Sequence, residues 1–430
     1  MYIGGALFCS KILEQKLILL RATEEMLDID IVGGGLGGLA TAIAFRRQGH
    51  FVEVFEASSA TAFNELGAAI GCPPNAVRIL KSLGITVESI KGVEYAGITS
   101  LDHQSGTVGL SASLGDIKGQ YGHVWCLCHR VDLHEVLQRM AFGEEGEGPP
   151  AKLFLGTRAV SWDPKTNELA LSNGETRKPD LLIAADGINS ALRSAIVGQD
   201  IVASPTGVAS YRWLLDSAKL DNNPQLDWVI RKGPSGPRMV TSPDFRVLFL
   251  YPCRGKTIIN AMGIHMDDRI QTQVGFYVPS TQAKLLEKFK DFGPQYQQFL
   301  ELTDEEVGLW QLRSMPDLST WINGRSCLLG DSAHAMLPTI GQGAAMAFED
   351  AITLAHLIPL DTPCEDIPRR LSAYEFLRKE RADFVKGESL DQFIVPQKRA
   401  LYYRSPELQK RVMGFDAAAT AREYKRANFE

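Results

Sequence analysis

Three clusters of glycine and acidic residues carry the chemistry that this sequence can support. The first, residues 33–38, places Gly33, Gly35 and Gly38 in the pattern Gly-x-Gly-x-x-Gly. In a dinucleotide-binding turn the first glycine allows the tight turn, the second lets the backbone approach a pyrophosphate, and the third lets helix and strand pack closely. The free N–H groups that open the following helix then face the phosphates.

An acidic residue follows this turn at the distance that a nucleotide site requires. Glu56 lies 56 − 33 = 23 residues after Gly33, at the end of the second of two strands that we predict over 28–32 and 51–55. A carboxylate in this place accepts hydrogen bonds from ribose hydroxyls and repels a 2′-phosphate. The pattern therefore predicts a site for FAD or NAD rather than NADP.

Two further predicted strands end in a carboxylate. The apolar run 181–185 leads into Asp186-Gly187, and the run 327–329 leads into Gly330-Asp331. Residues 338–344 then form a Pro-x-x-Gly-x-Gly turn that opens an Ala-rich helix, whose positive N-terminal end would stabilise a reduced flavin anion. Each motif alone is common, but the three in this order and spacing are far more specific.

The elements around these motifs predict two kinds of layer. Residues 28–57 are typical of a strand, a helix and a second strand, which form one βαβ unit with parallel strands. From about 205 to 315, aromatic, Pro and β-branched residues become common and alternate with polar ones, which predicts an antiparallel sheet. The predicted fold class is α/β (α+β), with a Rossmann-type domain, an interleaved antiparallel β-sheet domain and C-terminal helices.

In its three motifs the sequence resembles the class A flavoprotein monooxygenases, in particular the salicylate-hydroxylase-like branch, over roughly residues 28 to 420. The resemblance implies non-covalent FAD, with NAD(P)H as co-substrate. It implies roles for Asp186, which serves FAD and NAD(P)H, for Asp331 on the ribityl chain, and for Arg130 near the phosphates. An ordinary Arg at a helix start is the alternative for Arg130. The full set of implied cofactor-binding residues is Gly33, Gly35, Gly38, Glu56, Ala69, Arg130, Asp186, Asp331, Pro338, Gly341, Gly343 and Ala344.

The same resemblance gives two catalytic candidates on the substrate side. Arg212 lies in a segment similar to the first strand of the family's substrate sheet, and Tyr251 in a Tyr-Pro-x-Arg-Gly segment. A structural ion pair and a core tyrosine are the respective alternatives. Hydroxybenzoate-type relatives carry a His four residues before this Tyr, but here position 251 − 4 = 247 is Val247. Its absence argues against carboxylate-bearing substrates and His-assisted deprotonation.

The implied activity is an FAD-dependent monooxygenase that uses NAD(P)H and dioxygen to hydroxylate or epoxidise an electron-rich phenolic or indole substrate, in secondary metabolism. An FAD oxidase or dehydrogenase is the nearer alternative, and a flavin-binding module without its own substrate is the other. A flavin-dependent halogenase needs a Trp-x-Trp-x-Ile-Pro segment, and none of the six Trp lies in one.

We predict five segments along the chain. They are an N-terminal extension over 1–27, the FAD-binding domain over 28–200 and 319–390, the substrate-binding sheet domain over 201–318, and a C-terminal helical segment over 391–430. Charged residues interrupt the apolar patches of 1–20, so no membrane span or ordinary signal peptide is expected there.

Charge and cysteine content limit the kinds of partner and the compartment that we expect for this protein. Lys and Arg number 45 and Asp and Glu 51, and this net charge of −6 gives no reason to expect nucleic acid or an anionic membrane. An odd number of scattered cysteines, seven, favours a reduced, cytoplasmic protein. Cys126 and Cys128 lack a second pair at ligand spacing, so we expect no metal. Both a monomer and a homodimer are consistent with the sequence.

Overall fold

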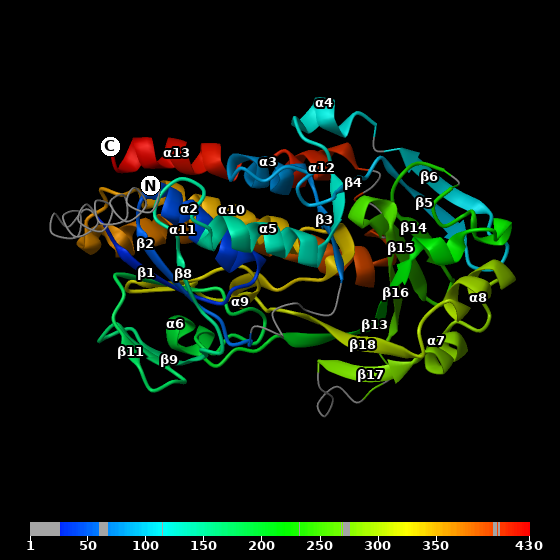
Figure 1. The fold of residues 1–430 in the computed structure, drawn as a ribbon, viewed down its shortest axis with the longest axis horizontal. Helices are drawn as coiled ribbons and strands as arrows, with labels where there is room; N and C mark the ends of the chain where they lie inside the picture. Colours follow the sequence, from blue (N-terminus) through cyan, green and yellow to red (C-terminus); the bar gives the residue numbers. More distant parts are fainter. Residues whose placement is uncertain are drawn as a thin grey trace, which may run out of the picture.

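The computed structural model describes residues 26–59, 68–113, 115–231, 233–267, 269, 276–398, 402 and 405–430. Figure 1 shows an elongated molecule with two parts side by side. One part holds the first strands of the chain and most of its helices, and the other holds a large sheet. No helix within the described ranges is long and apolar enough to cross a membrane.

The first part is built on a six-stranded sheet in the order β19-β20-β12-β1-β2-β8. β1 pairs in parallel with β2 and β12, and β12 pairs in parallel with β20, so the predicted βαβ unit is confirmed. Burial on both faces explains why β12 is a continuous apolar run. The strands are β1 (Asp28–Val32), β2 (Phe51–Phe55), β8 (Lys152–Phe154), β12 (Leu181–Ala184), β19 (Ile322–Asn323) and β20 (Ser326–Leu328).

Helices cover this sheet. The helix of the βαβ unit, α2, contacts α5 and α10, and α10 in turn packs on α3, α11 and α13. Figure 1 shows α13 running along the outside of this helical layer. The helices of this part are α2 (Leu36–Gln48), α3 (Pro74–Ser82), α4 (Ile117–Tyr121), α5 (Arg130–Phe142), α6 (Arg193–Val197), α9 (Asp331–His334), α10 (Gly343–Leu357), α11 (Ile367–Ile394), α12 (Pro406–Met413) and α13 (Ala417–Asn428).

The second part is an eight-stranded sheet in the order β17-β18-β13-β16-β15-β14-β5-β6. Its neighbours are antiparallel, as predicted, except that β14 and β5 are parallel. Since β5 and β6 come from residues 97–113, the sheet draws on the chain outside 201–318, and the domain boundaries stay a prediction. The strands are β5 (Gly97–Asp102), β6 (Val108–Ser113), β13 (Ser204–Asp216), β14 (Arg238–Thr241), β15 (Val247–Cys253), β16 (Ile258–Met266), β17 (Tyr277–Thr281) and β18 (Glu306–Ser314).

The two faces of the eight-stranded sheet have different environments. On one face Tyr211 and Trp213 lie in a core that includes side chains of α7 (Gln282–Lys288) and α8 (Pro294–Glu301). On the other face Met239, Phe249 and Met262 are partly buried against the core of the first part. Because side chains alternate along a strand, Arg212 shares this second face. The sheet therefore presents one face to its own helices and the other to the nucleotide-binding part.

Two small sheets complete the fold. One pairs β3 (Ala69–Cys72), β7 (Cys126–His129) and β4 (Val93–Glu94), and the other pairs β9 (Ala159–Asp163), β10 (Glu168–Leu171) and β11 (Thr176–Arg177). The cysteines within the described ranges are all free thiols. Cys72 and Cys128 lie 3.9 Å apart between their sulfur atoms, in a fully buried environment that raises the pKa of both thiols.

The glycine turn after β1 gives a test of the packing. A Cβ at position 38 would lie 2.0 Å from the carbonyl oxygen of Gly33, which is backbone and cannot move aside. Overpacking of this kind costs about 1–3 kcal/mol, so we expect Gly38→Ala to lower the free energy of unfolding by that amount in urea denaturation of the FAD-free protein.

Gly35→Ala is the matched control for this substitution. A Cβ at position 35 would meet no atom within 4 Å, so this variant should unfold at nearly the wild-type urea concentration. Equal stability of the two variants would show that helix and strand do not approach as closely as described.

Candidate active site

The turn between β1 and α2 holds Glu56 beside the glycines. Gly33 has a φ of +108°, and its N–H donates to the carbonyl of Phe55 at 2.8 Å. The N–H of Gly34 donates to one oxygen of Glu56 at 2.8 Å, and the N–H of Ser58 donates to the other at 2.7 Å. The open space at Gly35 lies in the same turn. The predicted glycines and acid are therefore together, around a place where a ligand can approach the backbone.

His134 also fixes this turn, which the sequence did not indicate. Its Nε2 lies 2.8 Å from the carbonyl oxygen of Gly34, and its Nδ1 lies 2.8 Å from the side-chain amide of Gln138. Because a carbonyl only accepts, Nε2 carries the proton and Nδ1 accepts from the amide. The imidazole thus ties α5 to the glycine turn.

Asp186 follows β12 and retains an unused acceptor. One carboxylate oxygen accepts from the N–H of Ala191 at 2.8 Å, while the other is buried and has no hydrogen-bond partner within the described part of the chain. Burial raises the pKa of this carboxyl. A buried acceptor without a partner costs free energy, and a ligand hydroxyl would satisfy it. The residue fits a role in holding a polyhydroxylated cofactor.

Asp331 lies at the start of α9, directly after Gly330 with its φ of +67°. Its side chain is exposed to solvent, yet protein atoms surround it closely enough to raise the pKa of its carboxyl. His334, Arg130 and Arg193 act in the opposite direction, since a positive charge nearby lowers the pKa of a carboxyl. Asp331 and Arg130 are therefore close enough to interact electrostatically.

Arg193 links the segments of Asp186 and Asp331. It is 2% exposed, and its guanidinium donates to the carbonyls of Ser332 at 2.7 Å and Ile188 at 2.8 Å. Sequence reasoning missed this residue, because its acceptors are backbone carbonyls that no residue type reveals. The contact fixes the two carboxylate-bearing strand ends relative to each other.

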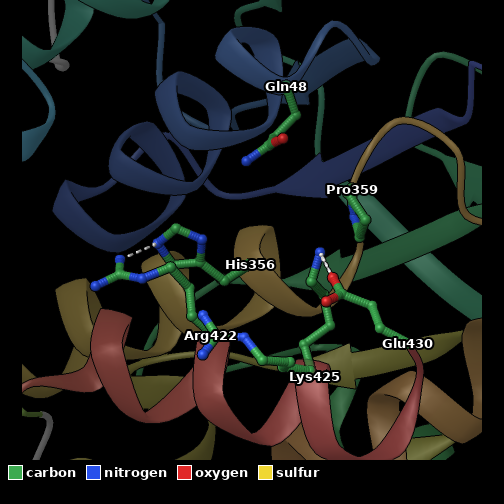
Figure 2. Close-up of a pocket in the computed structure, with 7 residues that line it drawn as sticks. Gln48, His356, Pro359, Arg422, Lys425 and Glu430 are labelled. Atoms are coloured by element: carbon green, nitrogen blue, oxygen red, sulfur yellow. Dashed lines mark hydrogen bonds and ion pairs between the residues drawn. The ribbon is translucent and has the colours of Figure 1, made fainter.

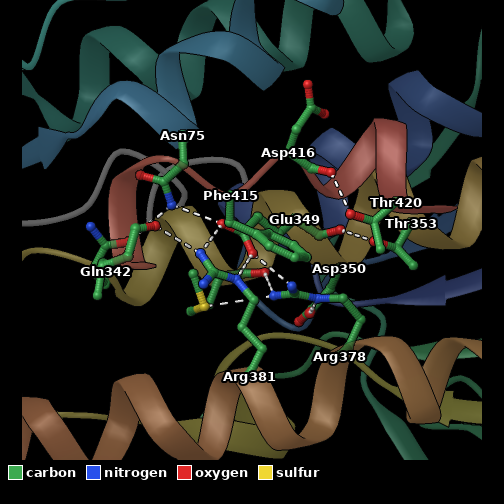
Figure 3. Close-up of polar contacts among 12 residues, drawn as sticks. Asn75, Gln342, Glu349, Asp350, Thr353, Arg378, Arg381, Phe415, Asp416 and Thr420 are labelled. Carbon is green, nitrogen blue, oxygen red and sulfur yellow. Dashed lines mark hydrogen bonds and ion pairs between the residues drawn. The ribbon is translucent and has the colours of Figure 1, made fainter. Parts of the chain in front are cut away.

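A buried ion network fixes the start of α10 (Figure 3). Arg378 donates to Glu349 at 2.6 Å and to Asp350 at 2.9 Å, and Arg381 donates to Glu349 at 2.7 Å. Asn75 donates both to Glu349 and to the side-chain oxygen of Gln342, the residue that precedes the helix. Burial raises the pKa of Glu349 and Asp350, but their cationic partners outweigh it and hold both below the ordinary values.

Asp350 also reaches the turn before Asp331. Its second oxygen accepts from the N–H of Gly330 at 3.0 Å and lies 2.7 Å from Nε2 of His334. The predicted turn residues lie between these anchors: Pro338 opens a 3-10 turn (Pro338–Ile340), Gly341 has a φ of +65°, and Gly343 and Ala344 open α10. The network thus sets the place of the helix N-terminus that was expected to face the flavin.

The two substrate-side candidates lie on one face of the large sheet. Arg212 is opposite Met262, which is opposite Phe249, and Tyr251 is two residues further along that strand. Arg212 is half-buried and makes no hydrogen bond or ion pair with any residue that the structure describes. Its guanidinium carbon lies 5.6 Å from the ring centre of Trp310.

Tyr251 is 6% exposed and packs edge-on against Phe249, with ring centres 5.8 Å apart. Burial raises the pKa of its hydroxyl, so the phenol stays protonated at neutral pH. On the neighbouring strand Asn260 accepts a 3.0 Å hydrogen bond from the N–H of Ala69, which joins the sheet to β3. Ala69 therefore lies where the two parts meet.

A separate pocket lies at the ends of three helices (Figure 2). Arg422 donates to His356 at 3.3 Å, and Lys425 pairs with Glu430 at 2.8 Å. Burial and the neighbouring cations lower the pKa of His356 to about 4, so it accepts as a neutral ring. Since α2, α10 and α13 all end near this pocket, the cations match the negative ends of the helix dipoles. None of the predicted site residues lines it.

The fold and the glycine turn define a dinucleotide-binding enzyme with a separate sheet beside the nucleotide site. The chain belongs to the FAD binding domain family, whose model matches residues 26–386.

Curated relatives agree with this membership. Hispidin-3-hydroxylase of Neonothopanus nambi is 42% identical over 407 residues, which cover 92% of this chain and 96% of the relative. The FAD-dependent monooxygenase cfoG of Aspergillus candidus is 33% identical over 84% of both chains. A salicylate hydroxylase of Pseudomonas putida is 31% identical, also over 84% of both chains.

Solved structures share the fold. A salicylate hydroxylase substrate complex matches with a TM-score of 0.75 at 23% identity, covering 93% of this chain and 98% of the other. CtdE in complex with FAD and substrate 4 matches with a TM-score of 0.78 at 19% identity, covering 94% and 98%. The predicted fold class is confirmed, and the protein is an FAD-dependent aromatic monooxygenase that uses NAD(P)H as co-substrate.

The buried network gives a stability prediction. Arg378→Met leaves Glu349 and Asp350 with fewer cationic partners in a fully buried place, so we expect a loss of about 3–5 kcal/mol in the free energy of unfolding. Urea denaturation at neutral pH measures this loss. Arg231→Met, which removes exposed ion pairs to Asp221 and Asp227, is the control and should change stability by less than about 1 kcal/mol.

The loss should also depend on pH. The carboxyls of Glu349 and Asp350 have folded-state pKa values below the ordinary ones. Their contribution to the free energy of unfolding is therefore present above about pH 4, and it is lost as the pH falls through their folded-state pKa values. The difference in the free energy of unfolding between wild type and Arg378→Met should therefore decrease as the pH is lowered. A gap that stays constant to pH 3 would contradict the ionic origin of the effect.

Proposed function

We propose that this enzyme hydroxylates a phenol or enol that binds as its anion against Arg212, with Tyr251 donating a hydrogen bond to the same oxygen. The observation that carries this proposal is the state of Arg212. It is a half-buried cation without a carboxylate partner in the described ranges, on the sheet face turned toward the nucleotide-binding part.

A guanidinium keeps its charge at any physiological pH, so a partly desolvated one without a counterion favours an anionic ligand. The same attraction lowers the pKa of a bound phenol, and the resulting phenolate has more electron density on its ring carbons. FAD, once reduced by NAD(P)H, supplies with dioxygen an electrophilic oxygen for such a carbon. Arg212 thus selects the substrate form that reacts.

Tyr251 orients the same oxygen. Because its pKa is raised, it donates a proton in a hydrogen bond without losing it. Val247, at the position where hydroxybenzoate-type relatives carry a His, is 8% exposed on an apolar part of the sheet. Deprotonation of the substrate accordingly relies on the field of Arg212 rather than on a protein base at this position.

The geometry of the first part supports our assignment of the cofactor residues. In this proposal the pyrophosphate lies on the turn of Gly33, Gly35 and Gly38, the adenosine ribose on Glu56, and the remaining groups line the path to the sheet. These remaining residues are Ala69, Arg130, Asp186, Asp331, Pro338, Gly341, Gly343 and Ala344. The open space at Gly35 and the unsatisfied oxygen of Asp186 support the assignment.

The relatives guide the choice of test compound. The relative at 42% identity is a hispidin-3-hydroxylase, so hispidin is the first substrate to test, and we place the enzyme in secondary metabolism. Its free cysteines favour the cytoplasm, as a monomer or homodimer. Incorporation of one oxygen atom from labelled dioxygen separates hydroxylation from an oxidase or dehydrogenase reaction, which leaves the product unlabelled.

Arg212→Ala tests the proposal directly. The variant should retain FAD but lose about 10- to 100-fold in product formed per NAD(P)H consumed, because a charged hydrogen bond contributes about 1.5–3 kcal/mol. Product yield against NAD(P)H oxidation measures this coupling. Raising the pH toward about 10, where a phenol ionises unaided, should recover part of the loss.

Arg231→Ala, on the exposed surface, serves as the control and should couple like wild type. Unchanged coupling in Arg212→Ala, or a loss that does not respond to pH, would remove Arg212 from substrate activation.

A further inference from the structure

We infer that the substrate carries a second aromatic unit beyond the ring that is oxidised, and that this unit binds on Trp310 and Tyr277. Phe276, Tyr277 and Trp310 are here called the aromatic shelf. The inference rests on the proposed function, because the shelf begins where Arg212 ends.

The Trp310 ring contacts both other rings of the aromatic shelf. Tyr277 is opposite Trp310 in the register of β17 and β18, and their ring centres are 4.7 Å apart at an interplanar angle of 52°. Phe276 approaches Trp310 edge-on, at 5.4 Å and 78°. The rings therefore form one continuous aromatic surface along the β17 side of the large sheet.

The aromatic shelf and Arg212 lie on the same sheet face. Trp310 is opposite Ser210, two residues from Arg212, and residues two apart on a strand point to the same side. The guanidinium of Arg212 lies 5.6 Å from the Trp310 ring centre. A ligand oxygen bound to Arg212 thus leaves the rest of the ligand beside the Trp310 ring.

Gly308 leaves the space that the shelf needs. It is opposite both Arg212 and Pro279 in the sheet, so it lies between the cation and the edge strand. A Cβ at this position would lie 2.9 Å from a ring carbon of Tyr277 and 3.0 Å from the indole nitrogen of Trp310. Since the backbone here has no positive φ, the glycine serves close approach of the two rings rather than a turn.

The exposure of the shelf differs from that of the aromatic residues on the other face. Tyr211 and Trp213 on β13 are 4% and 7% exposed in the core with α7 and α8. Tyr277 is 40% exposed, and Trp310 is half-buried like Arg212. A ligand with an acidic hydroxyl on one ring and a second ring beyond it matches this pairing, with the oxyanion on the guanidinium and the distal ring on the aromatic shelf.

The experiment compares a phenol that carries a distal ring with one that has only a short alkyl group in its place. 4-Hydroxystilbene and 4-ethylphenol are titrated into the oxidised holoenzyme, and the change in flavin absorption gives each Kd without turnover. Wild type should bind the stilbene at least about 10-fold more tightly, because the additional ring is removed from water and stacks. Steady-state NAD(P)H oxidation gives KM and kcat for the same pair.

Variants at position 310 test whether Trp310 causes the preference for the stilbene over the ethylphenol. Trp310→Ala should raise the Kd and KM of the stilbene by about 10-fold and leave those of the ethylphenol within twofold, with kcat little changed. Trp310→Phe keeps an aromatic ring and should restore most of the preference. Phe376→Ala removes a 71% exposed ring on α11 and is the matched control, which should behave as wild type. FAD content and melting temperature are measured for every variant.

Each outcome decides between the two ideas. Equal binding of both phenols by wild type, or an equal loss for both in Trp310→Ala, would overturn the aromatic shelf while the proposed function stands. A wild-type holoenzyme that binds neither phenol and oxidises NAD(P)H no faster with either would instead overturn the proposed function itself.

Discussion

The buried carboxylate of Asp350 is the group on which the flavin side of the structure depends. It is 0% exposed and joins the Gly330 N–H, the His334 ring and the Arg378 guanidinium. Desolvation makes such a charge costly unless every partner is in place, so the three groups cannot move independently. Through them, the strand end at Asp331 and the first turn of α10 keep one relative position.

The other half of the site depends on a sheet that separates two tasks. One face packs with α7 and α8 and supplies stability, while on the other face Arg212 has no carboxylate partner among the residues that the structure describes. A hydrogen bond from the N–H of Ala69 to Asn260 joins β3 of the nucleotide-binding part to that face. In the proposed function, this arrangement keeps the charge of Arg212 available to a substrate oxygen.

Sequence reasoning succeeded where local pattern and backbone chemistry coincide. The strands at 28–32 and 51–55 and the helix between them were predicted within their observed bounds, because glycine spacing and apolar periodicity act over a few residues. The approach of Glu56 to the glycine turn also followed from spacing alone. The contacts of His134 and Arg193 could not be found in this way, since both bind backbone carbonyls far along the chain.

The sequence by itself determined the fold class, the presence of a flavin site and the residues of its motifs, since glycine conformation and strand periodicity are local properties. Only the tertiary structure decided which strands share a face and which charges find partners. The parallel pairing of β14 with β5, the position of Arg212 away from every described carboxylate and the contact of Trp310 with Tyr277 all depend on strand register. Register brings together residues that are distant in the chain, and no local pattern specifies that pairing.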